Sequence, residues 1–395
     1  MFRNKNTFAV VISACLFLVT CGSSSDNDTP IIEKDTVKPT ITCLEDIDII
    51  IELNETSTDV TYTTPVGTDN LAGASTVQTA GLKSGSSFPL GKTINTFEVT
   101  DAAGNKSSCS FNITVSHPEA NTPYSLENGV PTPDGQKWTR VESLSDDFDG
   151  TSFDDNKWHR NPATDGFNWI GREPALFESD NVSVSDGNLN VTVEKFDSPK
   201  TVNGKEWTHG GAIIRSKEKA KQGHYYECRM KANKTIMSST FWIAFQQNCN
   251  TGPIRKLELD IQECVGRVHS GTDSWASKWD NIFHSNAIRH KRTCDINEET
   301  RKSGVKNLTE KNHDRFFVYG CWWKSPTEIL FYLDGEYVYS ITPTTEFDLE
   351  GHITMAIETY SWNPVDEAGS IFETGSFDDL TTKYDWVRTW VLENE

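Results

Sequence analysis

Glu258, Asp260 and Glu263 place three carboxylates close together in the apolar run from Lys256 to Val265. Acids that share one face raise each other's pKa and lose solvation when a cleft covers them, so such a cluster seldom serves stability. Glycoside hydrolysis needs it, because one carboxylate attacks the sugar carbon and one protonated carboxyl group feeds the leaving oxygen. A solvated acidic edge strand and a divalent-cation site are the alternatives that the pattern alone leaves open.

The run that carries these acids is predicted to be a β-strand with one irregularity. Successive side chains of a strand point to opposite faces, so Glu258 and Asp260 share a face while Glu263 has the wrong parity. A β-bulge at Ile261 and Gln262 adds one residue and returns Glu263 to the face of the other two acids. The sequence therefore predicts one kinked strand whose three acids lie on the floor of a cleft.

The spacing Glu-x-Asp-x-x-Glu, with its bulge, resembles the active-site strand of glycoside hydrolase family 16, which includes laminarinases, β-agarases, β-porphyranases and κ-carrageenases. The resemblance implies that Glu258 is the nucleophile and that Glu263 is the general acid, then the base, with Asp260 tuning both. It also implies retention of configuration, with carboxyl oxygens about 5–5.5 Å apart. Glu263 must be protonated to donate, so we expect its pKa to be raised.

A second segment resembles agarases and porphyranases more narrowly. The aromatic loop from Phe167 to Phe177 matches their Trp-x-Gly-Arg-x-Pro-x-x-Phe pattern. Trp169 offers a flat apolar face to a sugar ring, and Arg172 offers a fork of donors to hydroxyl or sulfate groups. The alternative is that Trp169 belongs to the core and Arg172 to a surface ion pair. The other residues that we expect to bind substrate are Arg215, Trp242, His284, Glu358 and Trp362.

The resemblance favours red-algal galactans with β-1,4 linkages, of the agarose or porphyran type, as the substrate. A κ-carrageenase or a laminarinase of the same family is the alternative enzyme. A basic stretch from Arg289 to Arg292 is interpreted either as a sulfate-binding rim or as a solvated loop. The alternative of another class is a non-catalytic, galactan-binding surface lipoprotein, against which the intact set of three acids argues.

Composition limits the class of protein. The 395 residues suffice for two or three domains, and plentiful glycine and aromatic residues without long amphipathic helical patterns predict an all-β protein. A net charge of −20 argues against binding to nucleic acid or to an anionic membrane surface. We expect a monomer that needs no cofactor for catalysis.

The N-terminus has the pattern of a targeting segment. Arg3 and Lys5 precede an apolar run from Phe8 to Val19, which is too short to span a membrane. The segment resembles a bacterial lipoprotein signal over residues 1–20, with Cys21 as the lipidated first residue of the mature chain; a secretory signal with a chance cysteine is the alternative. Residues 21–35 are predicted to be a flexible tether. We expect an exported lipoprotein at the outer membrane or cell surface, whose only membrane contact is this anchor.

Three further parts follow the tether. Residues 36–117 resemble a hyaline repeat (HYR) domain, an immunoglobulin-like β-sandwich, in which Cys43 and Cys109 are expected to form a disulfide. We interpret this module as a spacer or adhesion module. A linker over 118–136 leads to residues 137–395, for which the family implies a concanavalin-like β-jelly-roll sandwich. The pairing of five later cysteines stays open: Cys228, Cys249, Cys264, Cys294 and Cys321.

The family resemblance also implies a structural metal. Many members hold calcium where the two ends of the catalytic domain meet, and the corresponding positions here are Asp147, Gly187 and Asp385. Oxygen ligands fit a hard cation such as Ca²⁺. Carboxylates at strand ends that hold no metal are the alternative.

Overall fold

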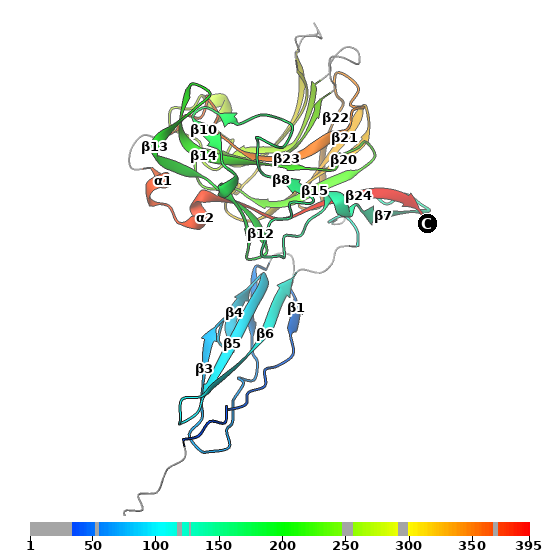
Figure 1. The fold of residues 1–395 in the computed structure, drawn as a ribbon. Coiled ribbons are helices and arrows are strands. Elements are labelled where there is room, and N and C mark those ends of the chain that lie inside the picture. The colour runs from blue at the N-terminus through cyan, green and yellow to red at the C-terminus, as the bar shows by residue number, and fades with distance from the viewer. Residues whose placement is uncertain are drawn as a thin grey trace, which may run out of the picture.

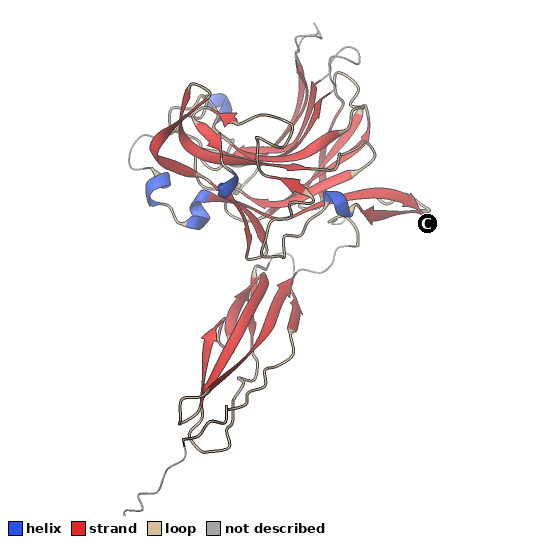
Figure 2. Ribbon diagram, viewed as in Figure 1, coloured by secondary structure: helices blue, strands red, loops and turns tan. Residues whose placement is uncertain are grey.

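The structure is a computed structural model that describes residues 34–51, 55–116, 121–125, 128–246, 256–290, 299–365 and 370–395. Regular structure in these residues is almost entirely β-strand, arranged as a small and a large module (Figures 1 and 2), so the predicted all-β fold class is confirmed. The signal segment and the lipidation site Cys21 lie outside the described residues. Within the described ranges, no helix has the length and apolar character that crossing a bilayer requires.

The small module is a sandwich of a four-stranded and a two-stranded sheet, in the orders β1-β6-β5-β3 and β2-β4. Its core contains Phe88, Phe97 and Phe111, which are almost fully buried. Cys43 and Cys109, the pair expected to form a disulfide, are joined by one in the structure. The strands are β1 (Ile47–Ile50), β2 (Ser57–Val60), β3 (Ser75–Ala80), β4 (Ser86–Pro89), β5 (Gly91–Thr100) and β6 (Lys106–Ser116).

The large module has two sheets, and the first, which we call the cleft sheet, carries the three acids. Its strands follow the order β19-β18-β17-β16-β23-β14-β10-β9, and β13 and β8 pair with β14. Its strands are β8 (Trp158–His159), β9 (Gly171–Arg172), β10 (Ala175–Phe177), β13 (Glu194–Val202), β14 (Lys205–Ser216), β16 (Ser238–Gln246), β17 (Lys256–Val265), β18 (Ile282–His290), β19 (Thr300–Asn307) and β23 (Gly351–Ile357).

The second sheet, which we call the outer sheet, follows the order β11-β12-β24-β15-β20-β21-β22, and β7 pairs with β24. The first and last strands of the large module therefore pair with each other. Its strands are β7 (Gln136–Arg140), β11 (Val182–Ser185), β12 (Asn188–Thr192), β15 (Tyr225–Lys231), β20 (Phe317–Ser325), β21 (Glu328–Leu333), β22 (Glu336–Ile341) and β24 (Thr381–Asn394).

The main core of the large module lies between these two sheets. Alternation along the strands sends one row of apolar side chains inward from each sheet, for example Leu257 and Leu259 from β17 and Tyr319 and Cys321 from β20. The opposite face of the cleft sheet is left free to carry polar groups. Short helices cover edges of the sandwich: η1 (Glu142–Leu144), η2 (Ser179–Asn181), η4 (Ser274–Ala276), α1 (Ile371–Thr374) and α2 (Phe377–Leu380).

Candidate active site

A bulge in β17 brings the three acids to one face. Trp242 of β16 pairs with Asp260 and Phe241 pairs with Gln262, so Ile261 is the extra residue. The predicted bulge is therefore confirmed. Ile261 enters the core with the apolar residues on either side of it, and the acids point the other way. Glu258 and Glu263 line a cavity of about 840 Å³, with Asp260 2% exposed beneath them.

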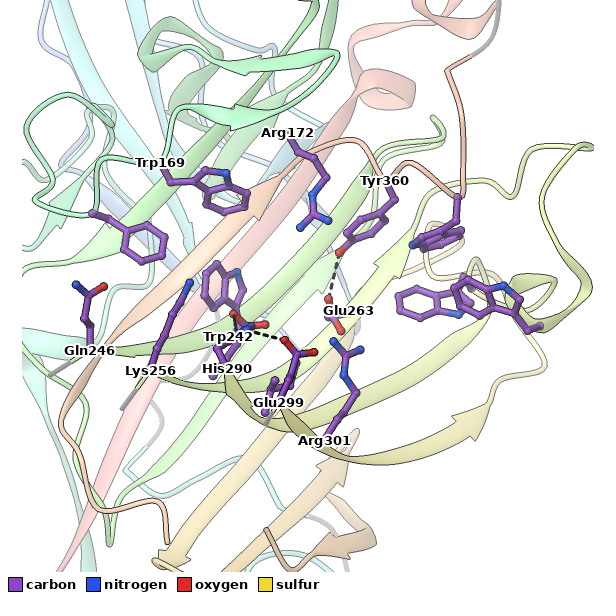
Figure 3. Close-up of a pocket in the computed structure, with 16 residues that line it drawn as sticks. Trp169, Arg172, Trp242, Gln246, Lys256, Glu263, His290, Glu299, Arg301 and Tyr360 are labelled. Atoms are coloured by element: carbon purple, nitrogen blue, oxygen red, sulfur yellow. Dashed lines mark hydrogen bonds and ion pairs between the residues drawn. The ribbon is translucent and has the colours of Figure 1, made fainter. Parts of the chain in front are cut away.

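Aromatic side chains form much of this cavity (Figure 3). Trp169 and Trp242 lie on one wall with their rings 6.3 Å apart, so both predicted stacking residues line the cavity. Trp362 also lines it, packed against Trp279 at 4.9 Å and stacked on Tyr360 at 5.1 Å. Flat apolar faces of this kind suit the faces of sugar rings.

The loop that carries Trp169 and Arg172 is fixed by its backbone. Gly171 has a φ of +126°, and a side chain at this position would collide with the carbonyl oxygen of Ala175 across the β9–β10 turn. Only glycine tolerates both conditions. The Thr359 hydroxyl donates to the Arg172 carbonyl at 2.6 Å, which ties the loop to the segment after β23. The tight turn therefore explains why the glycine precedes the arginine.

Arg172 lines the cavity and is also an ion-pair partner. Its Nε donates to Glu358 Oε2 at 2.6 Å, and its guanidinium lies 5.2 Å from the Tyr360 ring centroid. Glu358 is 5% exposed, and burial raises its pKa to about 7 in spite of the arginine. Arg172 therefore both lines the cavity and forms an ion pair, so the two interpretations are both correct. Glu358 itself lies behind Arg172 and does not line the cavity.

The acids are held by neutral donors and imidazoles. Asn286 Nδ2 donates to Glu263 Oε2 at 2.6 Å and to Asp260 Oδ2 at 3.0 Å. The Tyr360 hydroxyl donates to Glu263 Oε1 at 3.1 Å, as the dashed line in Figure 3 marks. His290 Nε2 lies 3.1 Å from Glu258 Oε2. No arginine or lysine of the described residues forms an ion pair within 4 Å with any of the three acids.

Asp260 is the acid of the cluster whose neutral form its surroundings favour most. Burial, together with the charges of Glu263 and Glu258, holds the pKa of Asp260 well above its ordinary value. Burial also opposes ionisation of Glu263, but the His284 imidazole, the charge of Arg301 and the Tyr360 hydroxyl outweigh it and lower the pKa of Glu263. The expected rise at Glu263 is therefore wrong for the ligand-free protein, because the neighbouring donors stabilise its charged form.

Besides Glu358, two more of the residues expected to bind substrate lie behind the cavity. Arg215 is 5% exposed, donates to the Asp165 carbonyl oxygen and places its guanidinium 4.4 Å from the Phe167 ring centroid. It supports the Phe167 wall of the cavity from below. His284 is 7% exposed, and its Nδ1 lies 3.5 Å from Glu263 Oε2. Neither side chain lines the cavity, so each acts on it through a neighbour.

The cavity also contains charged groups that were not predicted as site residues. Lys256, His290, Glu299 and Arg301 line it, and Arg172 and Arg301 reach toward Glu263 from opposite sides (Figure 3). Parity along the strand was a usable signal for Lys256, which shares a face of β17 with Glu258. His290 belongs to the basic stretch and ends β18 opposite Lys256, whereas the place of Arg301 depends on the pairing of β18 with β19. Lys291 and Arg292 of the predicted basic stretch lie outside the described residues.

The positions predicted for calcium do not offer a ready set of ligands. Asp147 accepts from Arg140 Nη1 and from Arg388 Nε, each at 2.7 Å. Asp385 accepts from Arg229 Nη1, also at 2.7 Å. Guanidinium groups therefore already neutralise both carboxylates, which does not suit a divalent cation. Among the later cysteines, Cys228, Cys264 and Cys321 are free and buried, and Cys249 and Cys294 lie outside the described residues.

Comparison with known families gives two matches. The family described as "Beta-porphyranase A-D, GH16 domain" matches residues 138–392. The family described as "HYR domain" matches residues 34–115. The two matches correspond to the large and the small module of the structure.

Individual relatives resemble the large module. Beta-porphyranase B of Zobellia galactanivorans is 42% identical over 261 residues, which are 65% of this chain and 86% of that protein. Beta-porphyranase C of the same organism is 38% identical over 298 residues, covering 69% and 83%. Beta-agarase AgaB34 of Agarivorans albus is 25% identical over 288 residues, covering 65% and 57%.

Solved structures share the fold of the large module. The crystal structure of porphyranase B from Zobellia galactanivorans has a TM-score of 0.63 and 39% identity, and the match covers 69% of this chain and 99% of that one. Beta-agarase A in complex with oligoagarose has a TM-score of 0.53 at 19% identity, covering 67% and 96%. The second likeness concerns the fold alone.

Proposed function

The chain belongs to the β-porphyranase A–D group of glycoside hydrolase family 16 and is a glycoside hydrolase, and from this premise we propose that it cleaves porphyran, a sulfated red-algal galactan, at internal β-1,4 linkages. One observation carries the choice of a sulfated substrate. In a protein of net charge −20, the cavity around the acids is lined by Lys256, Arg172 and Arg301. Guanidinium and ammonium groups are the usual partners of sulfate and phosphate oxygens.

The relatives support the same choice. Relatives named as porphyranases are 33–42% identical to this chain, whereas relatives named as agarases are 25–28% identical to it. Agarose carries no sulfate, so an agarose-specific cleft has less use for three cationic side chains beside its acids. Agarose hydrolysis is therefore the second candidate, supported by the shared aromatic loop that carries Trp169 and Arg172.

The mechanism that we propose uses Glu258 as nucleophile and Glu263 as acid and then base. Glu258 attacks the anomeric carbon while Glu263 protonates the leaving oxygen, and water then releases the covalent glycosyl-enzyme with retention. The raised pKa of Asp260 favours its neutral form, which lowers the negative charge that the cluster places beside the Glu258 nucleophile. His290, 3.1 Å from Glu258, orients the nucleophile.

Glu263 must gain a proton before it can act. In the ligand-free protein its pKa is lowered by His284, Arg301 and Tyr360. A sugar bound in the cavity excludes water from Glu263, and a bound sulfate group occupies the cationic side chains nearby. Both changes favour the neutral carboxyl group, since they remove stabilisation from its charged form. Substrate binding thus raises the pKa of Glu263 and favours the protonated form that acts as the acid.

A reducing-sugar assay with sized products tests this proposal. Porphyran, enzymatically desulfated porphyran, agarose, κ-carrageenan and laminarin are compared at equal mass, with Glu263→Gln as the inactive control. We expect the highest rate on porphyran, oligosaccharide products throughout the digest, and retention when the first anomer is followed by NMR. A higher rate on agarose would assign the chain to agarose instead. Binding without release of reducing ends from any polysaccharide would identify a non-catalytic galactan-binding protein.

We further propose that the chain is exported and anchored by a lipid on Cys21, with the HYR module as a spacer between anchor and enzyme. The charged start and the short apolar run before Cys21 support this proposal. The test is fractionation of cells that express the full chain or its Cys21→Ser variant. We expect the full chain in the outer membrane and the variant outside it; equal partition of the two argues for an ordinary secretory signal.

A further inference from the structure

Asn286 lies directly beneath the acid cluster. It belongs to β18, where it pairs with Asp260 of β17 on one side and with Ser303 of β19 on the other. Its side chain is fully buried, and the sequence pattern assigned it no role. A buried amide at the contact between two acids needs an explanation, because a buried amide group without good partners is costly.

The hydrogen bonds of Asn286 use its whole carboxamide. Nδ2 has two hydrogens, and it donates to Glu263 Oε2 at 2.6 Å and to Asp260 Oδ2 at 3.0 Å. Oδ1 accepts from the Ser303 hydroxyl at 2.5 Å. A reversed amide would set Oδ1 against two carboxyl groups and Nδ2 against the serine. The two acids therefore fix the orientation of the amide, and the Ser303 hydroxyl, which can donate or accept, donates to the Oδ1 that faces it.

We propose that Asn286 is a positioning residue that holds Asp260 and Glu263 together and directs the acid proton of Glu263 to Oε1. Glu263 Oε2 is committed as an acceptor by the Asn286 bond. Oε1 accepts from the Tyr360 hydroxyl, which, unlike an amide N–H, can turn and accept instead, and both Glu263 and Tyr360 line the cavity. A proton on Oε1 therefore faces the space where the glycosidic oxygen binds. The inference rests on the proposed role of Glu263 as general acid.

A neutral bridge suits this task better than a charged one. An arginine between the two acids would hold both ionised, since ion pairs favour the charged forms. The Asn286 amide offsets their repulsion through two hydrogen bonds but leaves Glu263 free to take up and release its proton. The same bond to Oε2 favours the ionised form modestly. Its loss is thus expected to raise the pKa of Glu263.

The test compares Asn286→Ala with Asn312→Ala across a pH series on porphyran. Asn312 is also fully buried and bonds the Ile282 backbone and the Tyr319 hydroxyl, away from the acids. For Asn286→Ala we expect the alkaline limb of kcat/KM, which reports protonated Glu263, to move up by about one pH unit. We expect kcat to fall about tenfold or more with KM little changed. For Asn312→Ala we expect a lower Tm and unmoved limbs.

A second variant keeps the inference testable if Asn286→Ala does not fold. Ser303 is exposed, so Ser303→Ala should fold, and losing its hydroxyl removes the bond to Oδ1 and holds the amide less firmly. We expect a smaller shift of the alkaline limb in the same direction. Unmoved limbs with unchanged kcat in both variants would overturn the inference. If Glu263→Gln is inactive while both variants behave like the parent, only the positioning role fails; an active Glu263→Gln would instead remove the proposed function.

Discussion

The two sheets of the large module treat their acidic residues differently. Beside the outer sheet, Asp147 and Asp385 accept hydrogen bonds from arginines at 2.7 Å. On the cleft sheet, Asp260 and Glu263 accept from the neutral groups of Asn286 and Tyr360 instead. The arginines beside Asp147 lower its pKa against the effect of burial, which favours its charged form. The difference teaches that the donors beside an acid and the burial of that acid act together, since burial raises the pKa of Glu358 although Arg172 donates to it.

Two buried glutamates sharpen this comparison. Glu227 of the outer sheet accepts from Trp390 Nε1 at 2.7 Å and from the backbone N–H of Tyr124. Glu358, behind the cleft, accepts from Arg172. Burial raises the pKa of each to about 7. The two glutamates therefore have similar pKa values although one accepts from neutral N–H groups and the other from an arginine. Of the two, only Glu358 contacts a residue that lines the cavity.

The largest expected effect comes from Glu258→Gln. Glutamine keeps the shape of the side chain but cannot attack the anomeric carbon, so we expect turnover to fall about ten-thousandfold or more. The Tm should stay close to that of the parent, because Glu258 is partly exposed at the cavity floor. Initial rates on porphyran and thermal unfolding are the measurements. Near-parental rates would contradict the assignment of the nucleophile.

Asp385→Asn tests the acid of the outer sheet, where we expect an effect on stability rather than on activity. The substitution leaves the Arg229 guanidinium buried without its 2.7 Å carboxylate partner. Loss of one member of a buried ion pair typically costs about 3–5 kcal/mol of unfolding free energy. Urea denaturation measures this loss. We expect the activity per folded molecule to stay parental, and a selective loss of activity at full stability would mean that the outer sheet takes part in catalysis.

The sequence predicted the parts of the site that depend on local spacing. The parity of Glu258, Asp260 and Glu263 demanded a bulge, and β17 has it at Ile261. The aromatic loop before β10 placed Trp169 at the cavity in the same way. These features follow from alternation within one strand or one turn, which a single segment encodes.

Features that depend on pairing between distant segments could not be predicted. The pKa of Glu263 depends on His284 from β18 and on Tyr360, which follows β23. The arginines that neutralise Asp147 lie at positions 140 and 388, at opposite ends of the module. The family resemblance predicts that Arg215 binds substrate, yet its strand places the guanidinium against the Phe167 ring, behind the cavity. No local pattern fixes which strands become neighbours.

A pH series on stability tests the two glutamates of similar pKa. Between the ordinary pKa of 4.5 and about 7, folded Glu358 keeps a proton that the unfolded chain has released. The free energy of unfolding therefore falls as pH rises through this window, by roughly 3 kcal/mol for each buried glutamate. Glu358→Gln and Glu227→Gln should each remove one such fall, as urea denaturation at pH 5 and pH 8 would measure.

Activity then separates these two variants. Glu358→Gln weakens the partner of Arg172 at the cavity and should raise KM for porphyran, whereas Glu227→Gln should leave KM unchanged. Equal effects on KM would show that the position of a buried acid relative to the cleft does not matter. A flat pH dependence in the parent protein would mean that neither glutamate holds its proton near neutral pH.

The smallest expected effect comes from Tyr360→Phe. The variant removes the hydroxyl that donates to Glu263 Oε1 and keeps the ring that stacks on Trp362. The hydroxyl is one of the groups that lower the pKa of Glu263, so its loss raises that pKa. A bond worth about 1 kcal/mol corresponds to about 0.7 pKa units. We therefore expect the alkaline limb of kcat/KM to move to higher pH by that amount.

Tyr384→Phe is the matched control for this last prediction. Its hydroxyl donates to the Thr240 carbonyl oxygen at 2.7 Å inside the core, where it has no hydrogen bond to an acid of the described residues. We expect the control to lose about 1 kcal/mol of stability with no change in the pH profile. Tyr360→Phe should show the reverse, because its hydroxyl stabilises a charge rather than a packed core. If both tyrosine variants left the alkaline limb unmoved, the neutral donors of the cleft sheet would not control the proton of Glu263, and the contrast between the two sheets would reduce to stability alone.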